Sequence, residues 1–459
     1  MAADKRRPAD AARLTAAQVL HDVLEEGAFA NLSSIKKLDQ AGLRALDRRF
    51  ASAVIYGTLS RIYSLDFLIA KASDKPLSSL EPWVRTLLRM GAWQIIWSRS
   101  VPLAAAINET VQLAKTLTNP GAAGFVNAVL RRLGSGPMTL PANNPAVFYS
   151  LSPEIYGYLR KWYGTDEANR LAESFLRDDI SVTARTNCLK TTPAELADDL
   201  HACGINTAPG RYCPEALSLE LGGQPVRGLP AFRDGRLSIQ DESAMLTAHA
   251  AAPEPGQLII DLCAAPGGKT GHLAERSSDR ARILAFDNHP ERLKLVAENA
   301  SRLGLGSIEC RLGDATGQDA DQSLIGQADL VLADVPCSGL GLLARKPEIR
   351  LSMTHEKMIG LYPLQAAIID YAARLVRPGG VLVYSTCTIN PAENIERITA
   401  FLAQCDDQFV LEDLTPFLPG ALLEHPDLIS SASQGWIQLL PNRHGSDGFF
   451  IARLRRKDK

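Results

Sequence analysis

The alternation of strand and helix signals after Pro255 limits the possible fold more than any other feature of this chain. Apolar, strand-like runs at 258–263, 283–287, 328–335 and 381–387 alternate with longer stretches of helical period. These strands are apolar nearly throughout, which is typical of strands buried on both faces of a parallel sheet. We therefore predict an α/β domain of the Rossmann-like kind, with a mainly parallel sheet covered by helices on both faces.

The first third of the chain has apolar residues at helical spacing and breakers between the helices. We predict helices over 11–24, 50–68, 83–96, 103–117 and 122–133. An all-α bundle is the simplest assembly of these helices. The Gly-, Pro- and Asn-rich segment that ends at Pro145 marks a boundary.

Between the helical third and the α/β region the pattern is mixed. A helical stretch from Asn144 is followed by strand-like runs at 180–186, 216–221 and 235–240. The sequence therefore predicts three parts: a helical domain over 1–140, a helical linker with a small α+β module over 144–240, and a catalytic α/β domain over 241–459.

Charge is distributed unevenly along the chain. Residues 1–140 hold 18 Lys and Arg against 11 Asp and Glu, whereas the remainder holds 31 against 40. A basic domain attracts polyanions, although Lys and Arg on helices are most often a solvated face. Nucleic-acid binding by the N-terminal third is therefore one of two open interpretations.

The composition indicates a cytoplasmic protein without a membrane partner. The chain has 459 residues, is 46% hydrophobic, and has neither a signal-peptide pattern at its start nor an uncharged run long enough to span a bilayer. Its eight cysteines form no CxxC pair and have no His at ligand spacing, so we expect neither a metal nor a disulfide framework. We expect a monomer.

The candidate binding residues lie where the predicted strands end. Gly267 and Gly268 allow the backbone to approach a ligand closely, and the N–H groups of the next helix would face that ligand. Asp287 ends the next strand, where a carboxylate can accept hydrogen bonds from both hydroxyls of a ribose, and Asp314 follows the third strand. The chain contains no GxGxxG or GxxxxGK[ST] pattern, so adenosine with a compact substituent fits better than a dinucleotide or triphosphate. Alternatively, these carboxylates cap helices.

Two cysteines follow this loop at later strand ends, Cys337 in DVPCSG and Cys387 in YSTCTI. A thiol presented near a bound cofactor can attack an electrophilic carbon. The pattern thus indicates covalent group transfer.

Taken in order, DLCAAPGGKT, Asp287, GDA, DVPCSG and YSTCTI resemble the motifs of the S-adenosylmethionine-dependent RNA cytosine-5 methyltransferases. AAINETVQLAK and FVNAVLRR in the N-terminal third resemble the helical NusB RNA-binding fold, and ARTNCLKT and SIQDESA also look like the same family. The pairing is similar to the bacterial RsmB (Sun) family, which methylates a cytosine of 16S rRNA. Val335 and Thr388 depart from the usual Ala and Ser, and neither change removes a titrating or nucleophilic group.

The resemblance implies a role for each motif. Cys387 would be the nucleophile that adds to C6 of the base, Cys337 would assist product release, and Asp334 would face the N3 and N4 edge. S-adenosylmethionine would be the cofactor and 16S rRNA the partner. The implied cofactor-binding residues are Cys263, Ala264, Ala265, Pro266, Gly267, Gly268, Lys269, Asp287, Asp314 and Asp334.

Basic residues near these motifs are candidate RNA contacts. Arg345, Lys346 and Arg350 follow the first cysteine motif, and Arg185 lies in the middle module. The alternative is that each of these side chains is ordinary solvated surface charge.

Two other functions stay open. One is a tRNA cytosine-5 methyltransferase, and the other is a non-catalytic RNA-binding or assembly factor, against which the intact Cys337 and Cys387 argue.

Overall fold

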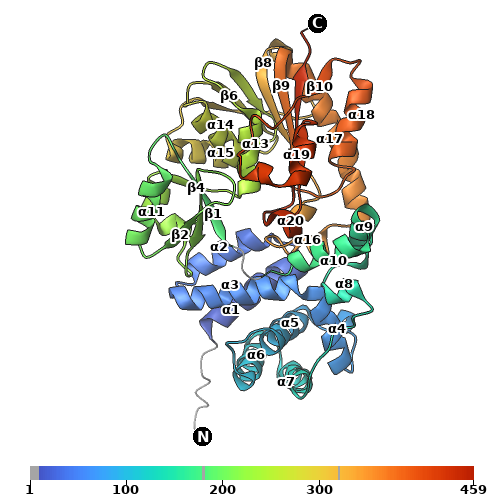
Figure 1. Cartoon of the computed structure of the whole chain (residues 1–459). Helices are drawn as coiled ribbons and strands as arrows, with labels where there is room; N and C mark the ends of the chain where they lie inside the picture. Colours follow the sequence, from blue (N-terminus) through green and yellow to red (C-terminus); the bar gives the residue numbers. More distant parts are fainter. Residues whose placement is uncertain (1–9, 178–180, 319–320, 459) are drawn as a thin grey trace. The chain divides into compact units, whose positions relative to one another are not determined.

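The computed structural model describes residues 10–177, 181–318 and 321–458, which form two compact units (Figure 1). The first unit contains the described residues before 179 together with Gly222–Gln224 and Leu343–Thr354. The second unit contains the other described residues. The predicted strand start at Ile180 lies outside the described residues.

The first unit is helical, as the sequence predicts. Its helices are α1 (Ala11–Glu25), α2 (Ala30–Gln40), α3 (Ala45–Ser60), α4 (Ile62–Ala72), α5 (Pro82–Ile96), α6 (Leu103–Leu117), α7 (Pro120–Gly134), α8 (Pro145–Phe148), α9 (Pro153–Tyr163), α10 (Thr165–Ser174) and α16 (Ile349–Ser352), with a 3-10 turn η1 (Leu77–Ser79). Apolar side chains of α1 to α7 form one buried core.

Proline and a capping side chain fix where several of these helices begin. Asn119 accepts a hydrogen bond from the N–H of Ala122 and is followed by Pro120, and Ser152 accepts one from Ile155 and is followed by Pro153. The side chain satisfies an N–H group that has no partner within the helix, while proline at the first position needs none. The breakers that separate helices in the sequence are therefore also helix starts.

One predicted helix is wrong in its length. The apolar pattern over 50–68 continues through Arg61, but the backbone of Arg61 is non-helical, with φ −110° and ψ 17°, and it separates α3 from α4. Among the described residues, no single helix is long and apolar enough to cross a membrane; α3 and α4 pass that test only as a pair bent by 81°.

The units differ from the predicted domains at both ends of the linker. The helices after Asn144 fall in the first unit, because α8 packs on α4 and on α9. The segment Leu343–Thr354 also joins this unit, and the Arg350 side chain from it donates to the carbonyl oxygen of Phe175 at 2.7 Å. The boundaries at 140 and 240 therefore do not coincide with the compact units.

The second unit begins with a small antiparallel sheet in the strand order β2-β3-β1-β4. Its elements are β1 (Val182–Thr186), α11 (Pro193–Ala202), β2 (Asn206–Pro209), β3 (Ala216–Glu220), η2 (Val226–Gly228), α12 (Pro230–Arg233) and β4 (Leu237–Ile239). A separate cluster of buried apolar residues covers this sheet. We call residues 181–221 and 225–239 the small-sheet module; its α+β character agrees with the sequence prediction.

The rest of the second unit is the predicted α/β domain. Its elements are α13 (Glu242–Ala251), β5 (Leu258–Asp261), α14 (Gly268–Arg276), β6 (Arg282–Asp287), α15 (Pro290–Leu303), β7 (Ile308–Leu312), η3 (Gln322–Leu324), β8 (Ala328–Asp334), η4 (Leu340–Leu342), α17 (His355–Leu375), β9 (Val376–Thr386), α18 (Ile395–Gln404), β10 (Phe409–Leu411), η5 (Leu422–Glu424), α19 (Pro426–Ala432), β11 (Trp436–Leu439), α20 (Pro441–His444) and β12 (Phe449–Arg456).

These strands form one sheet in the order β10-β12-β9-β8-β5-β6-β7, with β11 paired to β12. β5 to β9 run parallel, and β10 to β12 are antiparallel additions at one edge. Strand order reverses between β5 and β8, so the carboxyl ends of these strands form the place where an open α/β sheet binds its ligand.

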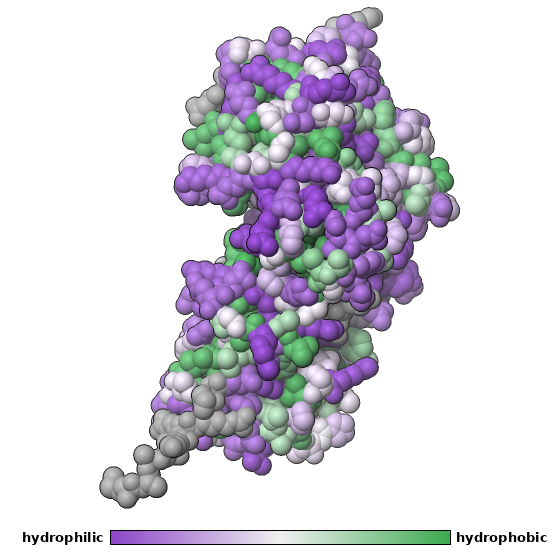
Figure 2. Space-filling model, turned by 90° about the vertical axis from the view of Figure 1, so that its left-hand side faces the viewer, coloured by the Kyte–Doolittle hydropathy of each residue, from purple (hydrophilic) through white to green (hydrophobic). Residues whose placement is uncertain are grey.

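Alternate side chains along each strand belong to different cores. Leu332 of β8 packs in the cluster that includes α13 and α14, whereas its neighbour Ala333 packs in the cluster that includes α17 and α18. Figure 1 shows these helices flanking the sheet. Burial on both faces explains why the strands are apolar nearly throughout. On the face shown in Figure 2, hydrophilic and hydrophobic residues are interspersed.

The two-sided core predicts a large effect for Leu332→Ala. Leu332 is fully buried, so truncation removes apolar contacts and leaves a cavity that should lower the free energy of unfolding by about 2–5 kcal/mol. Urea unfolding followed by circular dichroism measures the change. Leu312→Ala, at a side chain that is 63% exposed on β7, should change it by less than about 0.5 kcal/mol. Equal effects of the two variants would contradict the assigned core.

Candidate active site

The pairing of β8 with β9 places the two cysteine motifs side by side. Asp334 at the end of β8 is opposite Ser385 of β9, and the N–H of Val335 donates to the carbonyl oxygen of Ser385 at 3.1 Å. Cys337 lies three residues after Asp334, and Cys387 lies two residues after Ser385. Parallel strands bring both motifs to the same edge of the sheet.

The thiols of Cys337 and Cys387 are in contact. Their Sγ atoms lie 3.3 Å apart, and both side chains are half-buried. The hydrogen bond with Cys387, together with burial, raises the pKa of Cys337 well above its usual range. Either thiol can be the donor in this hydrogen bond between the two sulfur atoms.

A lysine from the glycine-rich loop region reaches the end of β8. Lys269 Nζ lies 2.7 Å from Asp334 Oδ2, and Ser385 Oγ donates to Asp334 Oδ1 at 2.7 Å. Burial lowers the pKa of Lys269, but the charges of Asp334 and Cys387 raise it, and the net shift is upward. Lys269 thus stays cationic beside the thiol pair. The structure joins Lys269, Asp334 and the cysteine motifs into one site.

The predicted cofactor loop connects β5 to α14. Gly267 has φ +99°, a left-handed conformation that favours glycine, and a Cβ there would lie 3.1 Å from Cα of Val296. Thr270 Oγ1 donates to Asp261 Oδ2 at 2.7 Å and fixes the first turn of α14 to the end of β5. The N–H groups at the start of α14 are the kind of donors that bind an anionic or polar ligand.

The next two predicted carboxylates lie at the ends of β6 and just after β7. Asp287 is buried. Its Oδ1 accepts the N–H of His289 at 3.0 Å, and its Oδ2 lies 3.6 Å from Nη2 of Arg292. Asp314 Oδ1 accepts the N–H of Thr316 at 2.7 Å. One oxygen of each carboxylate therefore stabilises its own turn. Neither carboxylate caps a helix, because α15 begins after His289 without a side-chain cap and Asp314 precedes a turn, and ligand binding by these residues stays a prediction.

A buried carboxylate that the sequence did not single out connects the two cysteine motifs. Glu393 is fully buried, and its oxygens accept from Ser338 N at 2.8 Å, Ser338 Oγ at 2.5 Å, Gln365 Nε2 at 2.9 Å and Asn390 Nδ2 at 2.9 Å. Ser338 follows Cys337, and Asn390 lies three residues after Cys387. In the sequence, an acidic residue ahead of a helix is indistinguishable from surface charge.

The predicted RNA contact at Arg350 is wrong. Arg350 is 1% exposed and donates to the carbonyl oxygens of Leu343 and Phe175, so its guanidinium is not available to a phosphate. Arg345 is half-buried and Lys346 is exposed. All three belong to the first unit, although they follow the first cysteine motif in sequence.

The predicted RNA contact at Arg185 is also wrong. The side chain is fully buried and makes a bidentate ion pair with Glu275 of α14. A guanidinium without exposed surface cannot contact a phosphate.

Two other groups in the described parts of the chain combine metal-binding residue types: Cys213, Glu215 and His249, and His425, Asp427 and His444. In the first, Nε2 of His249 and Nε2 of His272 lie 2.8 and 3.1 Å from Glu215 Oε1, so two imidazoles share one carboxylate oxygen. In the second, His444 Nδ1 accepts the N–H of Leu440, which places the proton of a neutral ring on Nε2. That nitrogen lies 3.3 Å from Asp427 Oδ2, and the absence of a metal stays a prediction.

Comparison with known proteins shows the family of this chain. The family model described as "16S rRNA methyltransferase RsmB/F" matches residues 248–455, and the model of the NusB family matches 10–135. A protein of Synechocystis named probable ribosomal RNA small subunit methyltransferase B is 35% identical over 97% of this chain and 99% of that protein. The chain belongs to this methyltransferase B family.

Two further relatives carry the same name. The Bacillus subtilis protein is 33% identical over 96% of this chain and 98% of its own length, and the Salmonella arizonae protein is 32% identical over 97% and 98%. These relatives confirm the expected family and the assignment as an RNA methyltransferase. The expected fold, with its all-α, α+β and α/β parts, is confirmed as well.

Solved structures extend the likeness to the fold. The crystal structure of PH0851 has a TM-score of 0.83 at 25% identity and covers 98% of this chain and 99% of that chain. The structure of NSun6 from Pyrococcus horikoshii, determined with SFG, has a TM-score of 0.58 at 23% identity over 68% of this chain and 100% of that one. The second likeness concerns the fold alone.

The Glu393 contacts predict that Glu393→Gln slows methyl transfer. The amide would turn an NH₂ group toward donors that need an acceptor, so the two cysteine motifs would lose their alignment and turnover should fall by roughly a hundredfold. Initial rates with RNA substrate measure this fall. Glu396→Gln, at an exposed carboxylate of α18, is the matched control and should leave the rate unchanged. An unchanged rate in Glu393→Gln would contradict the alignment role.

Asp261 predicts a pH dependence of stability. Burial raises the pKa of Asp261 to about 7, so between its ordinary value and about 7 the folded state binds a proton that the unfolded state has lost. Stability from this group is therefore present at low pH and falls as pH rises through that window. Asp261→Asn should remove this fall. The difference in the free energy of unfolding, variant minus wild type, should therefore increase from pH 4 to pH 7. A constant difference would contradict the raised pKa.

Proposed function

We propose that this protein transfers a methyl group from S-adenosylmethionine to C5 of a cytosine in 16S rRNA, through a covalent bond between Cys387 and C6 of the base. The observation that carries the proposal is the contact of two thiols, 3.3 Å apart, at adjacent strand ends beside Lys269 and Asp334. The names of the relatives support ribosomal RNA as the substrate. Such a substrate fits the cytoplasmic location that the sequence predicts.

The residues at the strand ends fit S-adenosylmethionine. The N–H groups at the start of α14 and the loop 263–268 would hold it by the backbone, Asp287 would accept from ribose hydroxyls, and Asp314 would face the exocyclic amine of adenine. When bound, the cofactor supplies an electrophilic methyl group. The chain's own residues act on the base.

The chemistry requires a nucleophile because C5 of cytosine is unreactive while the ring is aromatic. The thiolate of Cys387 adds to C6, which makes C5 an enamine-like carbon that can accept the methyl group. Loss of the C5 proton and departure of the thiolate then restore the ring. Cysteine suits both steps because its thiolate is a strong nucleophile and a competent leaving group.

The contacts of Cys337 and Asp334 support separate roles for them. The sulfur atoms of the two cysteines are in contact, and the resemblance of YSTCTI and DVPCSG to the family motifs favours Cys387 as the attacking thiol and Cys337 as an assistant in release. Asp334, fixed by Lys269 and Ser385, would stabilise a proton near N3 as C6 is attacked.

The target base must leave its stack before a half-buried thiol can reach C6. RNA around it would contact basic side chains. Of the predicted set we retain Lys346, which is exposed, and Arg345, which is half-buried.

The two cysteines predict opposite outcomes on substitution. Cys387→Ala should abolish turnover without an RNA adduct, because C6 is not attacked. Cys337→Ala should accumulate protein linked covalently to RNA, because release fails. Denaturing gel electrophoresis with labelled 16S rRNA measures the adduct, and bisulfite mapping measures the product.

The control is Cys405→Ala, at the C-terminal end of α18, which should retain turnover without an adduct. Reversed outcomes at Cys337 and Cys387 would reverse the roles. Methylation of total tRNA in place of 16S rRNA would overturn the proposed substrate.

A further inference from the structure

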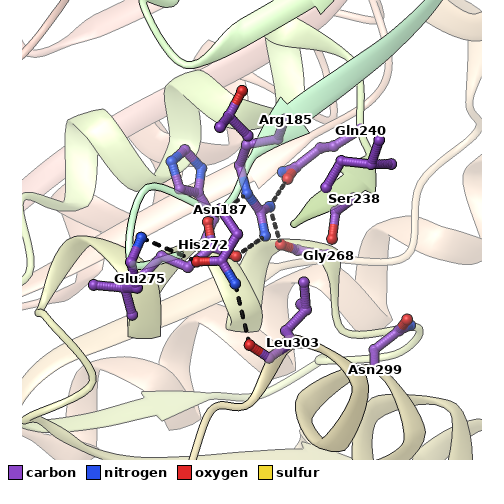
Figure 3. Close-up of polar contacts among 12 residues, drawn as sticks. Arg185, Asn187, Ser238, Gln240, Gly268, His272, Glu275, Asn299 and Leu303 are labelled. Atoms are coloured by element: carbon purple, nitrogen blue, oxygen red, sulfur yellow. Dashed lines mark hydrogen bonds and ion pairs between the residues drawn. The ribbon is translucent and has the colours of Figure 1, made fainter. Parts of the chain in front are cut away.

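The side chain of Arg185 extends from β1 of the small-sheet module to α14, the helix that follows the cofactor loop (Figure 3). It is fully buried. Placing an arginine there is costly unless every donor has a partner, so its partners indicate what it is for.

The guanidinium makes three kinds of contact. Nε and Nη2 donate to the two oxygens of Glu275 at 2.9 and 2.7 Å, which is a bidentate ion pair. Nη1 donates to the carbonyl oxygen of Gly268 at 2.8 Å and also contacts Gln240 Oε1. Gln240 directly follows β4, the last strand of the small-sheet module.

These partners lie at both ends of α14. Gly268 is its first residue and Glu275 its next-to-last, so one side chain contacts both ends of the helix. Gly271 lies between them, and a Cβ at that position would lie 3.4 Å from Arg185 Nη2. The absence of a side chain there lets the guanidinium lie against the helix.

A second set of hydrogen bonds connects the same module to the cofactor loop. Arg302 of α15 donates to the carbonyl oxygens of Phe232 and Leu237 at 2.7 and 2.9 Å and to Asn299 Oδ1 at 3.3 Å. Asn299 Nδ2 in turn donates to the carbonyl oxygen of Pro266 at 2.8 Å. The module thus contacts the loop at Gly268 directly and at Pro266 through two side chains of α15.

We propose that Arg185 is a positioning residue of the cofactor site: held in the small sheet, it fixes the first turn of α14 and with it the backbone that receives S-adenosylmethionine. The inference rests on the proposed function, because it takes the loop before α14 as the cofactor site. The small-sheet module is then a structural part of that site as well as a neighbour of it.

A charge-preserving substitution separates this role from an RNA contact. Lysine can bind a phosphate about as well as arginine at a single contact, but its one ammonium cannot pair with both Glu275 oxygens and also reach Gly268. Arg185→Lys should therefore weaken cofactor binding and leave RNA binding unchanged.

The experiment is isothermal titration of the full chain with S-adenosylhomocysteine, alongside filter binding of 16S rRNA at two salt concentrations. Arg185→Lys should raise the dissociation constant for S-adenosylhomocysteine at least tenfold, about 1.4 kcal/mol, while RNA affinity and its salt dependence stay as in wild type. Arg236→Lys is the matched control, because Arg236 pairs with Asp199 and Asp234 inside the module; it should bind S-adenosylhomocysteine as wild type does.

Equal S-adenosylhomocysteine affinity of Arg185→Lys and wild type would overturn the inference, as would a loss of RNA affinity alone. If Arg185→Lys does not fold, Glu275→Gln carries the test: it weakens the ion pair and should raise the same dissociation constant, and an unchanged value would overturn the inference. Wild-type protein that binds no S-adenosylhomocysteine would instead refute the proposed function.

Discussion

The register of β8 against β9 is the constraint on which the rest of the site depends. Asp334 is paired with Ser385, and the two cysteines follow at the same edge of the sheet with their sulfur atoms 3.3 Å apart. A shift by one residue would turn each side chain to the opposite face. The register is fixed because both faces are buried, so a shifted strand would bring side chains of the wrong size against both cores.

Buried charge then aligns what the register brings together. Glu393 contacts donors next to both cysteines, and Arg185 contacts both ends of the helix that follows the cofactor loop. Groups of this kind are costly to leave unpaired, so they favour one arrangement of their partners over others. The candidate catalytic residues lie at strand ends, whereas Glu393 and Arg185 are buried and contact the segments that carry those residues.

The errors of the sequence-based predictions have one physical origin. An arginine has the same identity in a sequence whether it is solvated or buried, and its neighbours in the chain do not include its partners. Arg185 and its partner Glu275 are 90 positions apart in the sequence, and Arg350 and its partner Phe175 are 175 positions apart. The break at Arg61 leaves no mark in the apolar spacing, which continues through the non-helical residue.

The sequence by itself determined the order of elements, the two-sided burial of the sheet and the strand ends at which functional residues lie, because period, apolar content and glycine placement are local properties of the chain. It also held the ordered motifs that identify the family. Only the tertiary structure decided that Cys337 and Cys387 are in contact, that Glu393 connects their loops, and that Arg185 supports a helix. Each of these depends on pairing between distant segments, which strand register and burial fix and local spacing does not.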